Sequence, residues 1–259
     1  MGIRGIDELI FPAVVAHRGS PSVEPENTLP SFAAAVAAGA DAVEFDVHLT
    51  VDGHAVVMHD ADVARTTDGR GLIEELTFAQ VRTLEAAPGV GVPSLEETLT
   101  GLSGKIGLDI EIKSPPDEAP GQGVARCVDE VVRLLDELPF DGPVIVSSFD
   151  AEALAHTRRI RPSLPTGMLV AGPVGPGVVR HARHAGHRFV LAHVAALEDA
   201  GEEFVRDCHE AGLCVGVWTV DEPERIERLF RLGVDAVVTN DPATAVPVRD
   251  AVRAERSQP

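Results

Sequence analysis

Residues 42–47 read AVEFDV, an apolar run that carries two carboxylates, Glu44 and Asp46. Alternate residues of a β-strand point to the same face, so the two carboxylates share one face of this segment. A run that is nearly continuously apolar, rather than strictly alternating, is typical of a parallel strand buried on both faces. The segment therefore predicts a parallel sheet in an α/β fold.

Seven further apolar runs resemble this segment, and helical patterns separate most of them. They cover residues 13–16, 106–112, 144–148, 166–170, 189–192, 214–219 and 236–239. The clearest helical pattern covers residues 123–138, where apolar residues keep a period of about 3.6. Eight strands with intervening helices predict a (β/α)8 TIM barrel, because connection handedness leaves few competing topologies. An open doubly wound sheet is disfavoured, since no glycine-rich phosphate fingerprint follows the first run.

Residues 55–58 form another apolar run, but it follows residues 42–47 too closely for a helical crossover. Asp52-Gly53 lies between the two runs and is a tight-turn signal, which predicts a β-hairpin. If these two residues form the turn, cross-strand partners have numbers that sum to 105. This register predicts that Asp46 faces His59.

The chain of 259 residues has the length of one α/β barrel domain. One long interruption, residues 60–105, contains Pro88, Pro93 and several glycines together with two short helical patterns. We expect this interruption to be an inserted subdomain at the barrel mouth, within a single domain that covers residues 1–259.

Acidic residues outnumber basic ones, with 41 Asp and Glu against 22 Lys and Arg and a net charge of −19. This excess argues against a nucleic-acid partner and against stable association with anionic membranes. The three cysteines are too few for a disulfide framework and are expected to be reduced thiols. The sequence shows no signal-peptide pattern and no window of about 18 apolar residues, which predicts a cytoplasmic protein.

Polar residues stand where several predicted strands end, which is where the chemistry of a TIM barrel takes place. These strand ends contain His17-Arg18-Gly19, the alternating set Asp109, Glu111 and Lys113, Trp218-Thr219, and Thr239-Asn240-Asp241. Glu44, Asp46 and Glu111 would repel one another at the barrel mouth unless a cation joined them. Ligation by oxygen atoms favours Mg²⁺ or Ca²⁺, with Mn²⁺ as a further candidate, over Zn²⁺. The sequence therefore predicts one divalent metal ion held by these three carboxylates, with salt bridging as the weaker alternative.

Two histidines and two basic residues accompany the carboxylates. His17 and His59 suit general acid–base work near neutral pH. Arg18 and Lys113 supply the positive charge that an anionic phosphoryl group would need. Together with a divalent metal ion, these residues predict a displacement reaction at phosphorus.

Other residues near the strand ends have competing explanations. Trp218 either fills the core or contacts the substrate, and its place at a strand end favours the substrate. Glu26 and Asn27 either cap the helix that follows or orient His17 or the metal. His48 flanks the predicted hairpin turn, and we expect it to be exposed.

In order and spacing, these motifs resemble the glycerophosphodiester phosphodiesterase family. The resemblance covers about residues 14–245 and rests on His17-Arg18-Gly19, Pro25-Glu26-Asn27-Thr28, Glu44-Phe45-Asp46-Val47, Asp52-Gly53, His59-Asp60, Arg65-Thr66-Thr67, Val92-Pro93-Ser94-Leu95-Glu96-Glu97, Glu111-Ile112-Lys113, Trp218-Thr219-Val220 and Thr239-Asn240-Asp241-Pro242. It implies a barrel whose small insertion helps to hold the glycerol end of the substrate. It also implies metal-dependent hydrolysis of glycerophosphodiesters to sn-glycerol 3-phosphate and an alcohol.

Each role that the resemblance implies falls on a matching position of this chain. Glu44, Asp46 and Glu111 would be the metal ligands, His17 and His59 the acid–base pair, Arg18 and Lys113 the phosphate ligands, and Trp218 a residue that flanks the substrate. One histidine would deprotonate the attacking group while the other protonates the leaving alcohol. Attack by a glycerol hydroxyl through a cyclic phosphate and direct attack by water both fit the sequence, and so do both assignments of acid and base.

Two alternatives to this function are open at the level of sequence. A lysophospholipase D-type barrel phosphodiesterase would need an exposed apolar patch at the mouth to meet lipid. A non-catalytic, metal-bearing binding module would need a broken set of site residues, and this set is complete. The excess of acidic residues favours a small soluble diester as the partner, and the sequence does not specify the oligomeric state.

Overall fold

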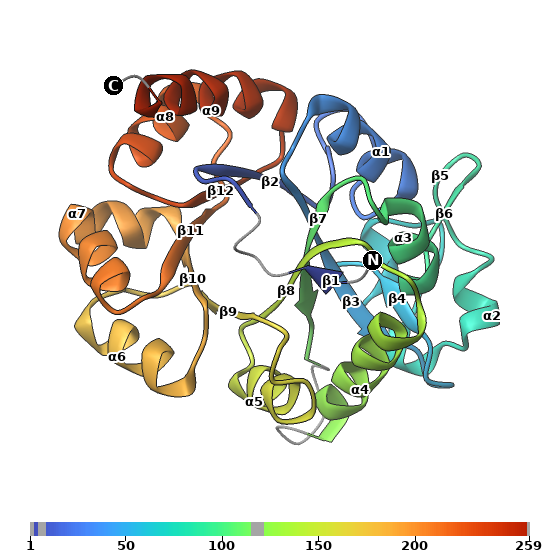
Figure 1. The fold of residues 1–259 in the computed structure, drawn as a ribbon. Coiled ribbons are helices and arrows are strands. Elements are labelled where there is room, and N and C mark those ends of the chain that lie inside the picture. The colour runs from blue at the N-terminus through green and yellow to red at the C-terminus, as the bar shows by residue number, and fades with distance from the viewer. Residues whose placement is uncertain (1–2, 5–8, 115–121, 258–259) are drawn as a thin grey trace.

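Parallel strands close into a barrel, and helices form a ring around it (Figure 1). The structure is a computed structural model that describes residues 3–4, 9–114 and 122–257. In their order around the barrel, the strands are β2 (Ala13–His17), β3 (Ala42–Leu49), β7 (Gly107–Ile112), β8 (Gly142–Ser148), β9 (Thr166–Val170), β10 (Phe189–His193), β11 (Cys214–Trp218) and β12 (Ala236–Thr239). β12 pairs with β2 and closes the barrel. The predicted (β/α)8 TIM barrel is confirmed.

Helices lie between successive barrel strands and after the last one. They are α1 (Leu29–Ala38), α3 (Leu95–Leu102), α4 (Gln122–Glu137), α5 (Ala151–Ile160), α6 (Pro176–Ala185), α7 (Val194–Glu210), α8 (Pro223–Arg231) and α9 (Pro242–Arg256). Local sequence sets their limits, as α1 shows. The Thr28 hydroxyl accepts from the amide of Ser31 at the start of α1, and Gly39 ends it with a φ of 81°.

The segment after β4 (Ala55–Val57) leaves the barrel and forms small elements of its own. They are η2 (Val63–Arg65), η3 (Ile73–Glu75), α2 (Phe78–Val81) and a hairpin of β5 (Glu85–Ala87) and β6 (Val90–Gly91), which project from the side of the barrel in Figure 1. Their buried side chains form a separate apolar cluster around Val63, Ile73 and Val81. In contrast, α3 packs into the main barrel core. The assignment of residues 60–105 as an inserted subdomain of a single domain stays a prediction.

The hairpin between β3 and β4 differs from its predicted register. The observed partners are Val47 with Val57, His48 with Val56, and Leu49 with Ala55, whose numbers sum to 104 rather than 105. The amide of Thr50 donates to the carbonyl of His54 at 2.9 Å, so three residues connect the strands. Gly53 takes the left-handed conformation in this connection, with a φ of 86°. A three-residue loop with glycine at that position is a common hairpin connection, and it shifts the pairing by one residue.

Two predictions about this hairpin are therefore wrong. Asp46 does not face His59, because the carbonyl of Asp46 accepts a hydrogen bond from the amide of Met58 at 3.0 Å. His48 is buried, with 7% of its surface exposed, rather than exposed. Its Nε2 lies 3.0 Å from the carbonyl oxygen of His59. This contact holds the chain beyond β4 against β3, and His59 still reaches the barrel mouth.

Every second residue of the barrel strands points inward, and apolar side chains fill the lower part of the barrel. These inner residues include Ala13, Val15, Ala42, Ile145, Phe189, Leu191, Cys214, Ala236 and Val238. Towards the carboxyl ends of the strands, the same inward positions carry polar groups, including His17, Glu44, Glu111 and Ser147. The barrel therefore has an apolar floor and a polar mouth.

A short strand, β1 (Ile3–Arg4), adds to β8 outside the closed ring. Over the residues that the structure describes, none of the helices combines the length and the apolar character needed to span a membrane.

Candidate active site

Strand register places the predicted site residues next to one another. His17 on β2 is the register partner of Glu44 on β3, and Asp46 is the partner of Glu111 on β7. A cavity of about 220 Å³ opens at this end of the barrel. Seven of the predicted site residues line the cavity, namely His17, Arg18, Glu44, His59, Glu111, Lys113 and Trp218. Asp46 is fully buried and is not among the lining residues.

The three predicted metal ligands form one buried carboxylate group. Glu44, Asp46 and Glu111 each offer an oxygen atom, and these atoms lie within 4.8 Å of one another. Glu44 Oε1 is buried and has no hydrogen-bond partner in the described part of the chain. Burying three carboxylates so close together is unfavourable because their negative charges repel one another, and a bound cation would offset that repulsion. The three residues could therefore hold a metal ion.

The pKa values of the three carboxyl groups reflect this crowding. Burial raises the pKa of Glu44 well above its usual value, and the charges of Asp46 and Glu111 add to the rise. Burial and the charge of Asp46 raise the pKa of Glu111 to about 7. Burial would also raise the pKa of Asp46, but the charges of Lys113 and Arg18 bring it down to about 2. A cation that binds here would compete with protons on Glu44 and Glu111.

Both predicted phosphate ligands pair with carboxylates of this group. Lys113 Nζ lies 2.8 Å from Asp46 Oδ1 and also contacts Glu111. Arg18 Nε lies 3.3 Å from Asp46 Oδ2, and its Nη1 donates to Glu26 at 2.9 Å. A guanidinium carries five N–H groups, so these two contacts leave donors that can face the cavity.

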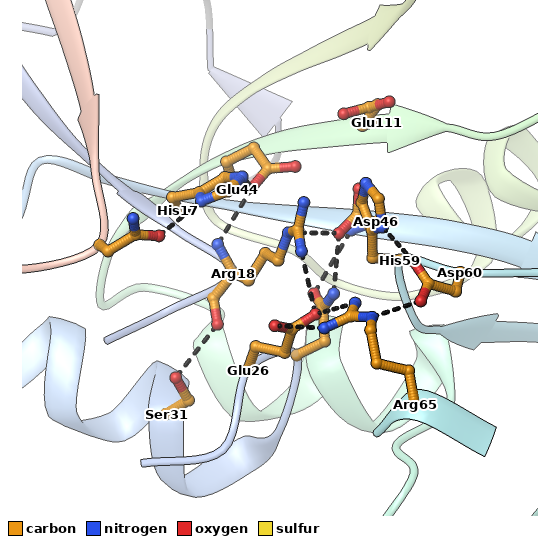
Figure 2. A network of polar contacts seen from close by, with 12 residues as sticks. His17, Arg18, Glu26, Ser31, Glu44, Asp46, His59, Asp60, Arg65 and Glu111 are labelled. Carbon is orange, nitrogen blue, oxygen red and sulfur yellow. Dashed lines mark hydrogen bonds and ion pairs between the residues drawn. The ribbon is translucent and has the colours of Figure 1, made fainter. Parts of the chain in front are cut away.

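The turn after β2 fixes Arg18 in an unusual backbone conformation. Arg18 has a φ of 53°, and its amide donates to Glu44 Oε2 at 3.0 Å (Figure 2). Gly19 follows with a φ of 91°, and any side chain there would collide with Ser31. The Ser31 hydroxyl donates in turn to the carbonyl of Arg18 at 3.1 Å. Glycine at position 19 therefore allows α1 to pack against the turn that carries Arg18.

His17 lies between the carboxylate group and the last barrel strand. Its Nε2 is 3.9 Å from Glu44 Oε2, and its Nδ1 is 2.7 Å from Asn240 Oδ1. Burial lowers the pKa of the His17 imidazole, and the charge of Arg18 lowers it further. These shifts favour the neutral imidazole at pH 7, and the side-chain amide of Asn240 holds its Nδ1 atom.

His59 follows β4 and has a carboxylate partner. Its Nδ1 is 2.5 Å from Asp60 Oδ1, and Arg65 contacts Asp60 through its Nε. Arg65 also donates to Glu26 at 2.7 Å, which joins the inserted segment to the loop after β2 (Figure 2). A hydrogen bond from Arg65 lowers the pKa of Asp60 to about 2, and its contact with His59 acts in the same direction. Asp60 is therefore ionised where it meets the ring.

Comparisons with known proteins identify the family of this chain. The family model described as the glycerophosphoryl diester phosphodiesterase family matches residues 17–244. This chain belongs to that family. A glycerophosphodiester phosphodiesterase of Caldanaerobacter subterraneus is 34% identical, over 90% of this chain and 96% of the relative. One of Bacillus subtilis is 31% identical, over 88% of this chain and 83% of the relative.

Solved structures show the same fold. An Oleispira antarctica phosphodiesterase in complex with its product sn-glycerol-3-phosphate is similar, with a TM-score of 0.85 and 29% identity. The match covers 93% of this chain and 97% of that protein. A glycerophosphodiester phosphodiesterase from Thermotoga maritima matches with a TM-score of 0.77 and 26% identity, over 93% of this chain and 100% of that one.

In this member of the phosphodiesterase family, part of the cavity has an apolar wall. Trp218, Phe149, Leu169, Leu191 and Val238 form the wall. The indole Nε1 of Trp218 donates to the carbonyl of Leu191 at 2.9 Å, which fixes the ring at the end of β11. Phe149 meets Trp218 edge-on at a centroid distance of 5.6 Å and is 53% exposed. The sequence did not point to Phe149, although it lies two residues beyond the inward-facing Ser147.

The structure excludes helix capping as the explanation for Glu26 and Asn27. Thr28 caps α1, so neither residue is the cap. Asn27 Nδ2 donates to Asp46 Oδ2 at 2.8 Å, and Glu26 contacts Arg18 and Arg65. Both residues therefore belong to the polar network around the carboxylates. Asp60 and Arg65 complete that network. In the sequence, only the order of the family-like motifs pointed to these two residues.

Proposed function

We propose that this chain hydrolyses glycerophosphodiesters to sn-glycerol 3-phosphate and an alcohol. The observation that carries the proposal is a buried group of three carboxylates, Glu44, Asp46 and Glu111, flanked by His17 and His59 in one cavity. Membership of the phosphodiesterase family and the product complex of the Oleispira protein support a small phosphodiester as the substrate.

The carboxylate group fits a divalent cation with a preference for oxygen ligands, with Mg²⁺ and Ca²⁺ as first candidates and Mn²⁺ as the next. Glu44 Oε1 is buried without a partner, and Lys113 and Arg18 do not neutralise the group, since they offer two charges to three carboxylates. A bound cation would supply Lewis acidity towards a phosphoryl oxygen and lower the pKa of an attacking hydroxyl.

His17 and His59 would transfer protons on either side of the phosphorus. Each ring is held through Nδ1, by Asn240 in one case and by Asp60 in the other. Nε2 of each ring is then the atom that can exchange a proton with the substrate. A ring held in this way needs no reorientation during the reaction, which favours proton transfer.

Arg18 and Lys113 would contact the phosphate from the charged side of the cavity. Both side chains pair with Asp46 and line the cavity. Trp218 and its apolar neighbours would face the carbon atoms of the substrate on the opposite side. A cavity with one charged wall and one apolar wall suits an amphipathic small molecule with a single phosphodiester.

The direct test is release of sn-glycerol 3-phosphate from glycerophosphocholine, followed by ³¹P NMR. We expect turnover with Mg²⁺, Ca²⁺ or Mn²⁺ and none after removal of metal ions by EDTA. Lysophosphatidylcholine is the comparison substrate, because preferential hydrolysis of it would favour a lysophospholipase D-type activity. Absence of turnover with every glycerophosphodiester and every metal would contradict the proposal and favour a metal-bearing binding module.

Asp60 offers a sharper test of the His59 side of the site. We expect Asp60→Asn to lower kcat by about 10- to 100-fold, the usual range for the loss of a partner that orients a functional group. The introduced amide lacks the charge that holds the ring and Arg65. KM should change by less than about threefold, because Asp60 lies behind the ring rather than against the substrate.

Asp62→Asn is the matched control, since Asp62 lies in the same segment and only caps η2 through the amide of Ala64. Steady-state kinetics of both variants check the prediction. Wild-type kcat in Asp60→Asn would show that the carboxylate does not support His59.

A further inference from the structure

Asn240 lies directly beside His17 because the barrel closes there. Thr239 at the end of β12 is the register partner of Ala16 on β2, so the next residues, Asn240 and His17, are neighbours. Asn240 Oδ1 is 2.7 Å from His17 Nδ1, although 223 positions separate the two residues in the chain. The family resemblance gives this asparagine no role, and its place at a strand end is otherwise consistent with a simple turn residue.

The orientation of the Asn240 amide is decided by a second residue, Asp221. Asn240 Nδ2 donates to Asp221 Oδ2 at 2.8 Å, and the backbone amide of Asn240 donates to Asp221 Oδ1 at 2.7 Å. The Thr239 hydroxyl donates to the same Oδ1 at 2.9 Å. A carboxylate accepts hydrogen bonds and donates none, so the NH₂ group of Asn240 must face Asp221. Its carbonyl oxygen must then face His17.

An amide oxygen at this position specifies the tautomer of His17. Oδ1 can only accept, so the proton of the neutral ring must sit on Nδ1. Nε2 then carries the lone pair and points to the cavity side, 3.9 Å from Glu44 Oε2. The other tautomer would place a lone pair against the Asn240 oxygen and would leave Nε2 unable to accept a proton.

We propose that Asn240 is a positioning residue that fixes the Nδ1–H tautomer of His17, and that Asp221 fixes the Asn240 amide in turn. Asp221 belongs to the segment after β11, which β12 holds through a hydrogen bond from the amide of Val220 to the carbonyl of Val238 at 3.0 Å. The effect on catalysis rests on the proposed role of His17. The tautomer itself does not depend on that role.

The most informative variant is Asp221→Asn, because Asp221 is not among the residues that line the cavity and reaches His17 only through Asn240. The introduced amide can keep its oxygen on the backbone amide of Asn240 and would then present NH₂ to the Asn240 side chain. The Asn240 amide should rotate to accept from this group, and its own NH₂ would face His17. We expect the ring to change to the Nε2–H tautomer, with kcat lower by about 10- to 100-fold and KM changed by less than about threefold.

A reciprocal exchange provides the rescue. Asn240→Asp combined with Asp221→Asn again places an acceptor against His17 Nδ1 and a donor against that acceptor. We expect this double variant to restore the Nδ1–H tautomer and to recover kcat to within about tenfold of the wild type. Asn240→Asp by itself sets two carboxylates face to face and should be the least active of the series. Asn240→Ala, which removes the acceptor without adding charge, should leave a mixture of tautomers.

Long-range ¹H–¹⁵N correlation spectra of ¹⁵N-histidine-labelled protein at pH 8 report the tautomer, with His17 assigned by its loss in a His17→Asn variant. Asp241→Ala is the control, because Asp241 caps α9 through Thr244 and should lower only the melting temperature. An unchanged tautomer and kcat in Asp221→Asn, or a double variant no better than either single one, would overturn the proposal. The spectra remain decisive if the protein does not hydrolyse glycerophosphodiesters, so the two proposals can fail separately.

Discussion

Replacing His17 or His59 with alanine is expected to lower kcat for glycerophosphocholine by about 10²- to 10⁴-fold, the range that a positioned acid or base contributes. The two rings come from different segments, the end of β2 and the chain after β4, and a different partner holds the Nδ1 atom of each. One ring therefore cannot take over the work of the other. Combining the two substitutions should cost less than the sum of the single effects, because groups that act together in one transition state are not additive.

The control for this prediction is His54→Ala. His54 lies in the same hairpin as the segment leading to His59, but its side chain is exposed and stacks on Phe78. The kcat of His54→Ala should equal that of the wild type. The histidine variants should still gain stability from added metal ions, because neither removes a carboxylate of the group. Diesterase activity preserved in His17→Ala or His59→Ala would refute the pair.

The barrel could be predicted from the sequence because parallel strands buried on both faces leave an unmistakable apolar pattern. Register within the barrel then brought His17 to Glu44 and Asp46 to Glu111 without any further signal. The hairpin register was the weak point. A two-residue and a three-residue connection both contain Gly53, and only hydrogen bonds that involve Thr50 distinguish them.

Partners of the site residues were harder to predict, for a physical reason. Asp221 and Asn240 act through hydrogen bonds between segments that meet only when the barrel closes. The alternation of inward-facing residues along a strand does indicate some of the residues that reach the site. Extending the inward phase by one step from Val238 reaches Asn240, and the same step from Ser147 reaches Phe149. The direction of an amide, in contrast, depends on atoms that no periodicity encodes.

The net charge of −19 argues against membrane lipid but does not show whether the site attracts an anion, because that depends on the local arrangement of charges. Within the cavity, Arg18 and Lys113 stand beside Asp109 and the three carboxylates of the group. Two positive charges do not balance these four acidic groups, and a divalent cation would make the local charge less negative. Attraction of a phosphodiester to the cavity would therefore depend on whether a metal ion occupies the carboxylate group.

Metal binding is expected to depend on pH in a direction that the carboxyl pKa values determine. The pKa of Glu111 in the folded chain is about 7, against an ordinary value of 4.5, and that of Glu44 is also raised. Between pH 4.5 and about 7, Glu111 binds more protons in the folded chain than in the unfolded chain. The free energy of unfolding of the metal-free protein therefore falls as pH rises through this range. A cation replaces those protons. The gain in melting temperature on adding Mg²⁺ or Ca²⁺ should therefore be small at pH 5 and grow through pH 7.

At pH 8 and a metal concentration about 100 times Kd, the gain should reach about 2.7 kcal/mol, or about 5–10 °C for a chain of this size. Differential scanning fluorimetry across pH 5–8, with and without EDTA, measures it. A gain that is constant across this range would contradict the competition between protons and the metal ion.

Glu111→Gln should produce two effects of opposite sign in one protein. Removing one of three crowded charges relieves repulsion, and Lys113 keeps Asp46 as a partner. The melting temperature of the metal-free variant should therefore be about 2–4 °C higher at pH 8, which corresponds to a free energy of unfolding higher by on the order of 1 kcal/mol. The same change removes a ligand, so metal-induced stabilisation should disappear and kcat should fall by at least about 10³-fold, since the Lewis acid contributes several kcal/mol. Asp109→Asn, on the same strand and also buried, is the matched control, and it should keep the metal-induced gain. Simple loss of packing cannot raise the melting temperature while abolishing turnover, so this combination separates a metal ligand from a structural carboxylate.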